Sequence, residues 1–309
     1  MLTFNAVATR IRLIPVSLPN HFAGGAAGGK DHMQSLINHL SQLQELILIR
    51  DEHRTTGDGS HMDRLNDAID EMTEKLPADV RSLFQRLCKK DHAVMAPMHE
   101  GCCAICGMRL PISQVQSVRV CKILQNCPSC ARILFADPEA VRWVGERPSR
   151  AEPRKVGISR FSAEGLMIPN LDAKAKEQAI TCLATNMETQ GFIQGAEKLV
   201  QSALDREAVL STAMENGLAF PHVRGVEGGG LTLTLGVSKA GIPFDDKGNA
   251  ANFIFFVTIP SAVSAFYLRL LSGLTETFLK EANRDALLAA ETPEQLWKAL
   301  IKATRYSIK

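Results

Sequence analysis

The sequence predicts an α/β protein. Its C-terminal part is expected to be an α/β sandwich, a mixed sheet flanked by helices, behind an N-terminal helical hairpin and a four-cysteine ribbon. Three observations lead to this prediction. After residue 160, helical apolar patterns alternate with strand-like ones, which is typical of helices that cover a sheet. Before residue 100, apolar side chains recur at helical spacing in two successive segments. The third observation is a pair of Cys-x-x-Cys motifs between these two parts.

The composition is that of a globular protein in water. Of the 309 residues, 45% are hydrophobic and 22% charged, and the formal net charge of +2 gives no general attraction to nucleic acid or membrane. Since single domains usually have ~100 to 200 residues, this length indicates two or three units. The best candidate for a membrane helix, residues 250–271, is interrupted by Asn252, Pro260 and Arg269. We therefore expect a cytoplasmic protein without a membrane segment.

Residues 1–32 predict a disordered tail. Pro15 and Pro19 interrupt its short apolar patch, and the run AGGAAGG that follows is typical of a flexible linker. A secretory signal peptide is the alternative interpretation of this segment.

Residues 33–100 predict a helical hairpin. Two segments carry an apolar stripe with the same spacing of i, i+4, i+7 and i+11, and a short polar loop joins them. The first stripe consists of Leu36, Leu40, Leu43 and Ile47, and the second of Leu65, Ile69, Met72 and Leu76. Each stripe spans fewer than two heptads, so packing within the chain and a short coiled coil that dimerises or docks a partner both remain open. A third short helix is expected after Pro77.

Residues 101–136 predict a zinc ribbon. Its four candidate ligands form two Cys-x-x-Cys pairs separated by 20 residues: Cys103, Cys106, Cys127 and Cys130. Two such pairs can place four thiolates around one tetrahedral zinc ion. Disulfides and a redox-active pair are the alternatives, and a single redox pair does not account for two motifs. Cys102 could replace Cys103, although only Cys103 gives the Cys-x-x-Cys-Gly knuckle.

The ribbon segment has a weak positive charge. Residues 101–135 contain four basic side chains and no acidic one, while four thiolates with one Zn²⁺ ion add about −2. The basic residues are not interleaved with aromatic ones, which favours protein docking or a structural role, and association with nucleic acid is the alternative. With the hairpin before it, the segment resembles bacterial C4-type zinc ribbon proteins that have an upstream coiled coil, which here is much shorter.

A linker and a second unit are expected after the ribbon. Residues 137–160 are rich in proline, arginine and glutamate, and residues 161–309 return to helical and strand patterns. TLTLGVS alternates like a strand, whereas FIFFVTI is a continuous apolar run like a buried one. Thr292 followed by Pro293 is a good N-terminal cap for the last helix.

His222 is the candidate nucleophile of this unit. Pro221 favours an extended chain before it, so a stiff segment presents the imidazole. Neutral histidine has a free nitrogen lone pair, and it can accept a phosphoryl group and pass it on. On this local pattern alone, an ordinary surface or core histidine is the competing interpretation.

The residues around His222 resemble a known family. One segment contains, in this order, Arg206-Glu207, Ser211-Thr212, Gly217, Ala219 and Pro221-His222. Together with AKAKEQAITCLATNMETQGFI, GVSKAGIPFD, ANFIFFVTIP and the final helix, this segment resembles the IIA domains of the phosphoenolpyruvate-dependent phosphotransferase system, of the fructose, mannitol and nitrogen-regulatory type. The resemblance runs from about Ser162 to Ser307.

The resemblance implies a phosphocarrier. In that family the histidine matching His222 accepts a phosphoryl group from the phosphorylated carrier protein HPr, and the arginine matching Arg206 helps to hold it. A guanidinium fork suits phosphate oxygens. The resemblance also places Ser211, Thr212 and Tyr267 at the phosphate.

Tyr267 stands where the family has a second histidine. A tyrosine hydroxyl can donate a hydrogen bond to a phosphoryl oxygen but cannot carry the charge of an imidazolium, so transfer should be weakened. Two interpretations follow: a nitrogen-regulatory-like phosphocarrier that signals to an unidentified target protein, alone or as a homodimer, and a IIA-fold interaction module that has lost transfer. Residues 228–230, three glycines, either offer amides to a phosphate or form a flexible turn.

Overall fold

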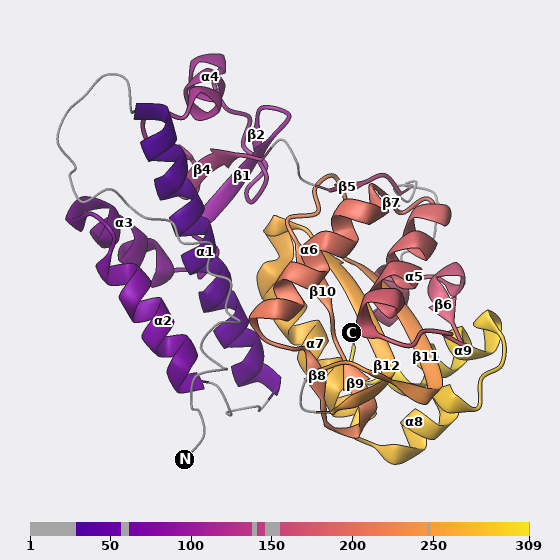
Figure 1. The fold of residues 1–309 in the computed structure, drawn as a ribbon. Helices are drawn as coiled ribbons and strands as arrows, with labels where there is room; N and C mark the ends of the chain where they lie inside the picture. The colour runs from indigo at the N-terminus through magenta and orange to yellow at the C-terminus, as the bar shows by residue number, and fades with distance from the viewer. Residues whose placement is uncertain (1–28, 57–61, 138–140, 146–154, 246–247, 309) are drawn as a thin grey trace, which may run out of the picture. The chain divides into compact units, whose positions relative to one another are not determined.

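The computed structural model describes residues 29–56, 62–137, 141–145, 155–245 and 248–308 (Figure 1). These residues divide into two compact units, with the boundary between residues 139 and 140. The predicted tail, residues 1–32, lies outside the described part of the chain except for its last four residues, which begin a helix. Among the described helices, none is both long and apolar enough to cross a membrane.

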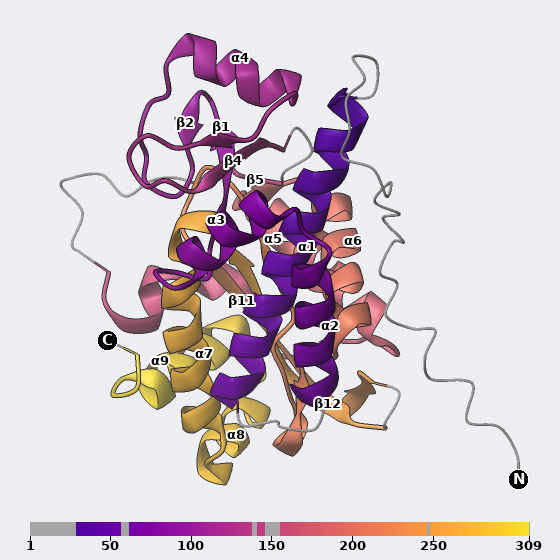
Figure 2. The ribbon, with the colours of Figure 1, turned by 90° about the vertical axis from the view of Figure 1, so that its left-hand side faces the viewer.

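Three helices open the first unit: α1 (Gly29–Thr56), α2 (Met62–Glu74) and α3 (Ala78–Cys88). α1 and α2 lie side by side (Figures 1 and 2), and every member of the two predicted apolar stripes is buried. The buried ring of His39 places Nε2 2.8 Å from the carbonyl oxygen of Met72, which joins α1 to α2. The N-terminal helices are therefore present, and their stripes pack inside the unit.

A small sheet follows, with the strand order β2-β1-β4-β3. Its strands are β1 (Met95–His99), β2 (Cys102–Cys103), β3 (Gln125–Asn126) and β4 (Ile133–Ala136), and α4 (Ile112–Val120) lies between β2 and β3 in the chain. β1 and β4 are parallel, and the other two pairings are antiparallel. The ribbon thus includes residues 95–99, which fall in the segment predicted as a hairpin, because β1 provides the backbone partners of both β2 and β4.

The second unit is built on a mixed six-stranded sheet with the order β6-β11-β12-β9-β8, in which β10 also pairs with β12. Its strands are β6 (Met167–Ile168), β8 (Ala213–Met214), β9 (Leu218–Ala219), β10 (His222–Arg224), β11 (Thr232–Pro243) and β12 (Ala250–Ile259). The long strands β11 and β12 are antiparallel, whereas β6 runs parallel to β11, and β9 and β10 run parallel to β12. The predicted mixed sheet is confirmed.

Helices cover both faces of this sheet (Figures 1 and 2). They are α5 (Lys176–Thr189), α6 (Ala196–Val209), α7 (Ser264–Phe278), α8 (Glu281–Leu288) and α9 (Pro293–Thr304). α5 and α6 lie on one face, and α7 to α9 lie on the other. The hydroxyl of Thr292 accepts a hydrogen bond from the backbone N of Gln295 at 3.2 Å, so α9 begins at the predicted cap.

Part of the predicted linker, residues 137–160, packs on the second unit. Within it, β5 (Arg142–Trp143) pairs with β7 (Ile193–Gln194) in antiparallel register. The backbone N of Trp143 also donates to the carbonyl oxygen of Glu227 at 2.8 Å. Backbone pairing, together with the Trp143 side chain that packs against the core of the second unit, attaches this stretch to the fold.

Candidate active site and metal centre

His222 is the first residue of β10 and directly follows Pro221. β9 and β10 run along β12 in the same parallel register, with Leu218 opposite Phe253 and His222 opposite Val257. Proline has no N–H to donate, but the carbonyl oxygen of Pro221 accepts from the backbone N of Val257 at 3.0 Å. The proline therefore interrupts the ladder without ending the extended segment, and the sheet holds the backbone of His222.

Contacts at Nδ1 set the orientation of the His222 ring, which is 2% exposed. Nδ1 lies 3.0 Å from the carbonyl oxygen of Phe220 and 3.2 Å from the hydroxyl oxygen of Tyr267. Because a carbonyl oxygen can only accept a hydrogen bond, Nδ1 carries the ring proton and donates it. In this tautomer a neutral ring keeps its lone pair on Nε2, the nitrogen that is then able to act as a nucleophile.

Tyr267 lies in the first turn of α7 and is 1% exposed. Its ring centroid is 5.0 Å from that of His222, with an angle of 41° between the planes. From β10, Arg224 places its guanidinium carbon 5.4 Å from the centroid of the same tyrosine ring. The structure thus brings Tyr267 to His222 and adds Arg224, which the sequence analysis missed. Arg224 could have been identified from the sequence, because residues two positions apart in a strand face the same side, and Arg224 is two positions after His222.

Arg206 lies in the last turn of α6, the helix that packs against β10. Its side chain is 7% exposed, and Nη1 donates to the carbonyl oxygen of Leu210 at 2.8 Å. This hydrogen bond orients the guanidinium where the helix ends and the chain turns toward β8. A role for Arg206 at a phosphate stays a prediction.

The hydroxyls of Ser211 and Thr212 donate to Glu207 in this structure. The Glu207 carboxylate is 3% exposed and accepts from the backbone N of Thr212 at 3.0 Å, from the Thr212 hydroxyl, and from the Ser211 hydroxyl at 3.5 Å. The carbonyl oxygen of Thr212 accepts in turn from the backbone N of Phe220 at 3.3 Å. Both residues therefore attach the loop after α6 to Glu207, and Thr212 also joins it to the segment that leads to His222.

Two of the three glycines after β10, Gly228 and Gly229, lie beside Trp143. A Cβ atom added to Gly229 would lie 1.9 Å from the Trp143 ring, and one added to Gly228 would lie 3.0 Å from the Trp143 carbonyl oxygen. The indole N–H of Trp143 donates to the hydroxyl of Thr232 at 3.1 Å. Gly228 and Gly229 therefore leave room for Trp143. This packing role differs from both predicted roles, a phosphate-binding loop and a flexible turn.

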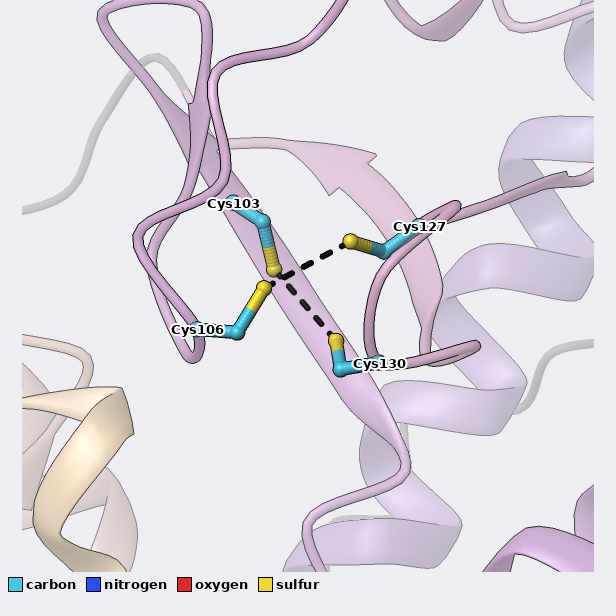
Figure 3. Close-up of side chains that lie close together, drawn as sticks. All are labelled: Cys103, Cys106, Cys127 and Cys130. Carbon is cyan, nitrogen blue, oxygen red and sulfur yellow. Dashed lines mark hydrogen bonds between the residues drawn. The ribbon is translucent and has the colours of Figure 1, made fainter.

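The four predicted cysteine ligands lie together in the first unit (Figure 3). Their sulfur atoms are all within 4.8 Å of one another, with 3.8 Å between those of Cys103 and Cys130 and 3.6 Å between those of Cys106 and Cys127. Sulfur atoms placed tetrahedrally at about 2.3 Å from one zinc ion would be about 3.8 Å apart. The cluster includes Cys103 and not the alternative Cys102. Its spacing suits a tetrahedral metal ion.

Both cysteine pairs lie in tight turns of the same form. The backbone N of Gly107 donates to the carbonyl oxygen of Cys103 at 2.8 Å, and that of Ala131 donates to Cys127 at 2.9 Å. Gly107 has a φ of 72° and Ala131 a φ of 62°, so both adopt the left-handed conformation. Glycine does this readily, whereas a residue with a side chain is strained. The second turn therefore forms in spite of strain at Ala131.

The thiols of the cluster differ in acidity. Burial raises the pKa of Cys103 to about 12, and burial also raises the pKa of Cys127. At Cys106, burial acts in the same direction, but hydrogen bonds from the Met108 amide and from the neighbouring thiols outweigh it and lower the pKa to about 7. A metal ion that binds here must therefore displace protons from Cys103 and Cys127.

A family model described as "Phosphoenolpyruvate-dependent sugar phosphotransferase system, EIIA 2" matches residues 160–303. The fructose-specific EIIABC component of Bacillus subtilis is 26% identical over 128 residues, which are 41% of this chain and 20% of that protein. The fructose-specific EIIA component of Haloferax volcanii is 27% identical over 126 residues, 40% of this chain and 82% of that protein. The mannitol-specific enzyme IIA component of Staphylococcus aureus is 29% identical over 141 residues, 44% of this chain and 91% of that protein. The chain thus spans only a fifth of the Bacillus relative but most of the other two.

Solved structures were also found to be similar to part of this chain. The nitrogen regulatory protein IIA-Ntr from Neisseria meningitidis superimposes with a TM-score of 0.42 at 19% identity, covering 46% of this chain and 97% of that one. IIA mannitol from Escherichia coli gives a TM-score of 0.38 at 18% identity, covering 45% of this chain and 97% of that one.

Proposed function

We propose that this chain, whose residues 160–303 form a type-2 EIIA domain of the phosphoenolpyruvate-dependent sugar phosphotransferase system, accepts a phosphoryl group on Nε2 of His222. The observation that carries the proposal is the contact between Nδ1 and the Phe220 carbonyl oxygen, because it leaves the lone pair on Nε2. The donor is a phosphorylated carrier protein of the HPr type. The phosphorylated chain then acts in regulation through contacts with a target protein.

Transfer to His222 exchanges one nitrogen–phosphorus bond for another. The lone pair of Nε2 attacks phosphorus and forms a new bond, while the bond to the donor's histidine nitrogen breaks and its electron pair returns to the donor ring. His222 keeps its Nδ1 proton during this step. The positive charge that the ring acquires is stabilised by the carbonyl oxygen of Phe220, which lies 3.0 Å from Nδ1. Passing the group to the next acceptor restores the neutral ring.

Arg206 supplies positive charge for the phosphoryl oxygens. Phosphoryl transfer depends mainly on positioning and on charge neutralisation, and Arg206 lies in the last turn of α6, the helix that packs against β10. Loss of one charge-assisted contact is worth about 1.5 to 3 kcal/mol, so Arg206→Ala should slow transfer by roughly ten- to a hundredfold.

A non-catalytic IIA-fold interaction module is the second candidate function. Two observations favour it: the His222 ring is 2% exposed, and the side chain beside it is the uncharged Tyr267. For transfer, docking of the carrier has to uncover the Nε2 side of the ring. In an interaction module, the buried histidine would simply be part of the core.

A labelling experiment separates the two functions. The chain is mixed with carrier protein of the HPr type that has been phosphorylated with radiolabelled phosphoenolpyruvate. We expect label that is acid-labile and base-stable, as in phosphohistidine, and its loss in His222→Gln. The control is His99→Gln, since His99 lies in β1 of the other unit. Wild-type protein that takes up no label at any carrier concentration would establish the interaction module instead.

We also propose that the four-cysteine cluster binds one structural Zn²⁺ ion. The ligands are Cys103, Cys106, Cys127 and Cys130. A zinc ion bound by four thiolates has no open coordination position, so it stabilises the ribbon and takes no part in a reaction. Purified protein should contain about one zinc per chain, and Cys106→Ser should lose it. Cys182→Ser, an exposed cysteine in α5, is the control and should keep the metal. Metal analysis that finds no zinc in the wild type would contradict this proposal.

A further inference from the structure

Arg224 lies on the same face of β10 as His222. The two residues are separated by one position in an extended strand, so their side chains point the same way and their Cα atoms are about 6.6 Å apart. Val223, between them, points to the opposite face and belongs to the hydrophobic core. The strand that positions the histidine thus positions an arginine beside it.

Tyr267 contacts both residues. Its hydroxyl lies 3.2 Å from Nδ1 of His222, and its ring lies under the guanidinium of Arg224, with the guanidinium carbon 5.4 Å from the ring centroid. A cation over the face of an aromatic ring is attracted by the ring's quadrupole. The tyrosine therefore restrains the arginine near the histidine, although it has no positive charge of its own.

We infer that Arg224 is a second phosphate-binding residue of this site, whose guanidinium binds the phosphoryl oxygens when His222 carries the group. This inference rests on the proposed function of His222. The planar guanidinium fork matches two phosphoryl oxygens, and an arginine stays charged at any pH at which the protein is folded. Arg206 and Arg224 come from different elements, α6 and β10, so the site binds the phosphoryl group with cations from a helix and from a strand.

The test compares wild type with Arg224→Gln and Arg224→Lys. The matched control is Arg269→Gln, because Arg269 stacks in the same way on a neighbouring ring of α7, with its guanidinium carbon 5.6 Å from the centroid of Phe266. The rate of labelling by phosphorylated carrier and the lifetime of the phosphohistidine are measured. We expect Arg224→Gln to slow labelling by about ten- to a hundredfold, Arg224→Lys to recover part of the rate, and Arg269→Gln to match wild type. Labelling of Arg224→Gln at the wild-type rate would overturn the inference.

A second measurement separates failure of this inference from failure of the proposed function. Inorganic phosphate is titrated into the unphosphorylated chain while the ring resonances of His222 are followed by NMR. A shift in wild type that is lost in Arg224→Gln supports the anion site, even if the carrier transfers nothing to the wild type. An equal shift in both proteins, or none in wild type, overturns it. If Arg224→Gln does not fold, the phosphate-induced shift is compared between wild type and Arg224→Lys, since lysine keeps the charge but not the planar fork of arginine. A smaller shift in Arg224→Lys supports the inference, and an equal shift overturns it.

Discussion

The hydroxyl of Tyr267 lies 3.2 Å from Nδ1 of His222, the nitrogen that also donates to the carbonyl oxygen of Phe220. A nitrogen with one proton can share that proton between two acceptors, so the tyrosine oxygen and the carbonyl oxygen together define the ring's orientation. The tyrosine supports the tautomer that leaves Nε2 nucleophilic. It brings no positive charge to a phosphorylated ring.

The contact between Tyr267 and His222 predicts a different effect for each of two substitutions of Tyr267. Tyr267→Phe keeps the ring and removes the hydroxyl, so labelling should slow by less than tenfold because the Phe220 carbonyl oxygen still holds Nδ1. Tyr267→His adds a group that can become an imidazolium, and it should lengthen the life of the phosphohistidine. The rate of labelling is measured for Tyr267→Phe, and the half-life of the label at constant pH is measured for Tyr267→His. A half-life in Tyr267→His no longer than in wild type would show that a positive charge at this position does not stabilise the phosphohistidine.

Gly229→Ala should destabilise the second unit. A Cβ atom there would lie 1.9 Å from the Trp143 ring, so the indole must move, at a cost of about 1 to 3 kcal/mol. Gly230→Ala is the control, since nothing lies within 4 Å of an added Cβ at that position. Denaturant unfolding followed by tryptophan fluorescence compares the two. Equal stability of both variants would mean that Trp143 does not occupy this place in solution.

The contacts of Trp143 also predict where the second unit begins. A fragment of residues 140–309 includes β5, whereas one of residues 157–309 lacks it and loses the contacts of Trp143 with Glu227 and Thr232. The shorter fragment should melt roughly 5 to 10 °C lower, from the loss of about 2 to 4 kcal/mol. Trp143→Ala in the longer fragment removes only the contacts of the indole ring and should account for part of this difference. Limited proteolysis of the whole chain should cut between residues 147 and 155. If the cleaved protein still unfolds in a single transition, the two units are not independent.

Local patterns predicted the helical stripes and the cysteine cluster, because each depends on residues close together in sequence. The buried stripe around Leu40 follows from helical spacing alone. The environment of Trp143 could not be predicted in this way, since it packs on Gly229, far along the chain, and a polar segment gave no sign of that contact. The acceptor role of Glu207 was not predicted for a similar reason, because its hydrogen bonds with Ser211 and Thr212 depend on how the chain turns after α6.

Ala131→Gly should stabilise the ribbon. Ala131 has a φ of 62°, where a residue with a side chain costs about 1 to 2 kcal/mol and glycine costs little. Glycine also loses more chain entropy on folding, so a net gain of about 1 kcal/mol is expected. Gly107→Ala, at the equivalent position of the first turn, should destabilise by a similar amount. Urea-induced zinc release, followed with a colorimetric chelator, should occur at higher urea for Ala131→Gly and at lower urea for Gly107→Ala.

The acidity of the ribbon thiols predicts the order in which they react. The pKa of Cys106 is lowered to about 7, whereas burial raises the pKa of Cys103 to about 12. Thiolates react with iodoacetamide and thiols do not, and Cys106 is also exposed. In metal-free folded protein near pH 7, Cys106 should therefore be alkylated first and Cys103 last, as measured by peptide mass spectrometry. Below pH 7 the thiolate of Cys106 is lost, and its rate should fall roughly tenfold per pH unit. Urea should make the two rates equal, and bound zinc should protect both cysteines. Equal rates in the folded metal-free protein would show that the arrangement of hydrogen bonds around Cys106 is not the one described.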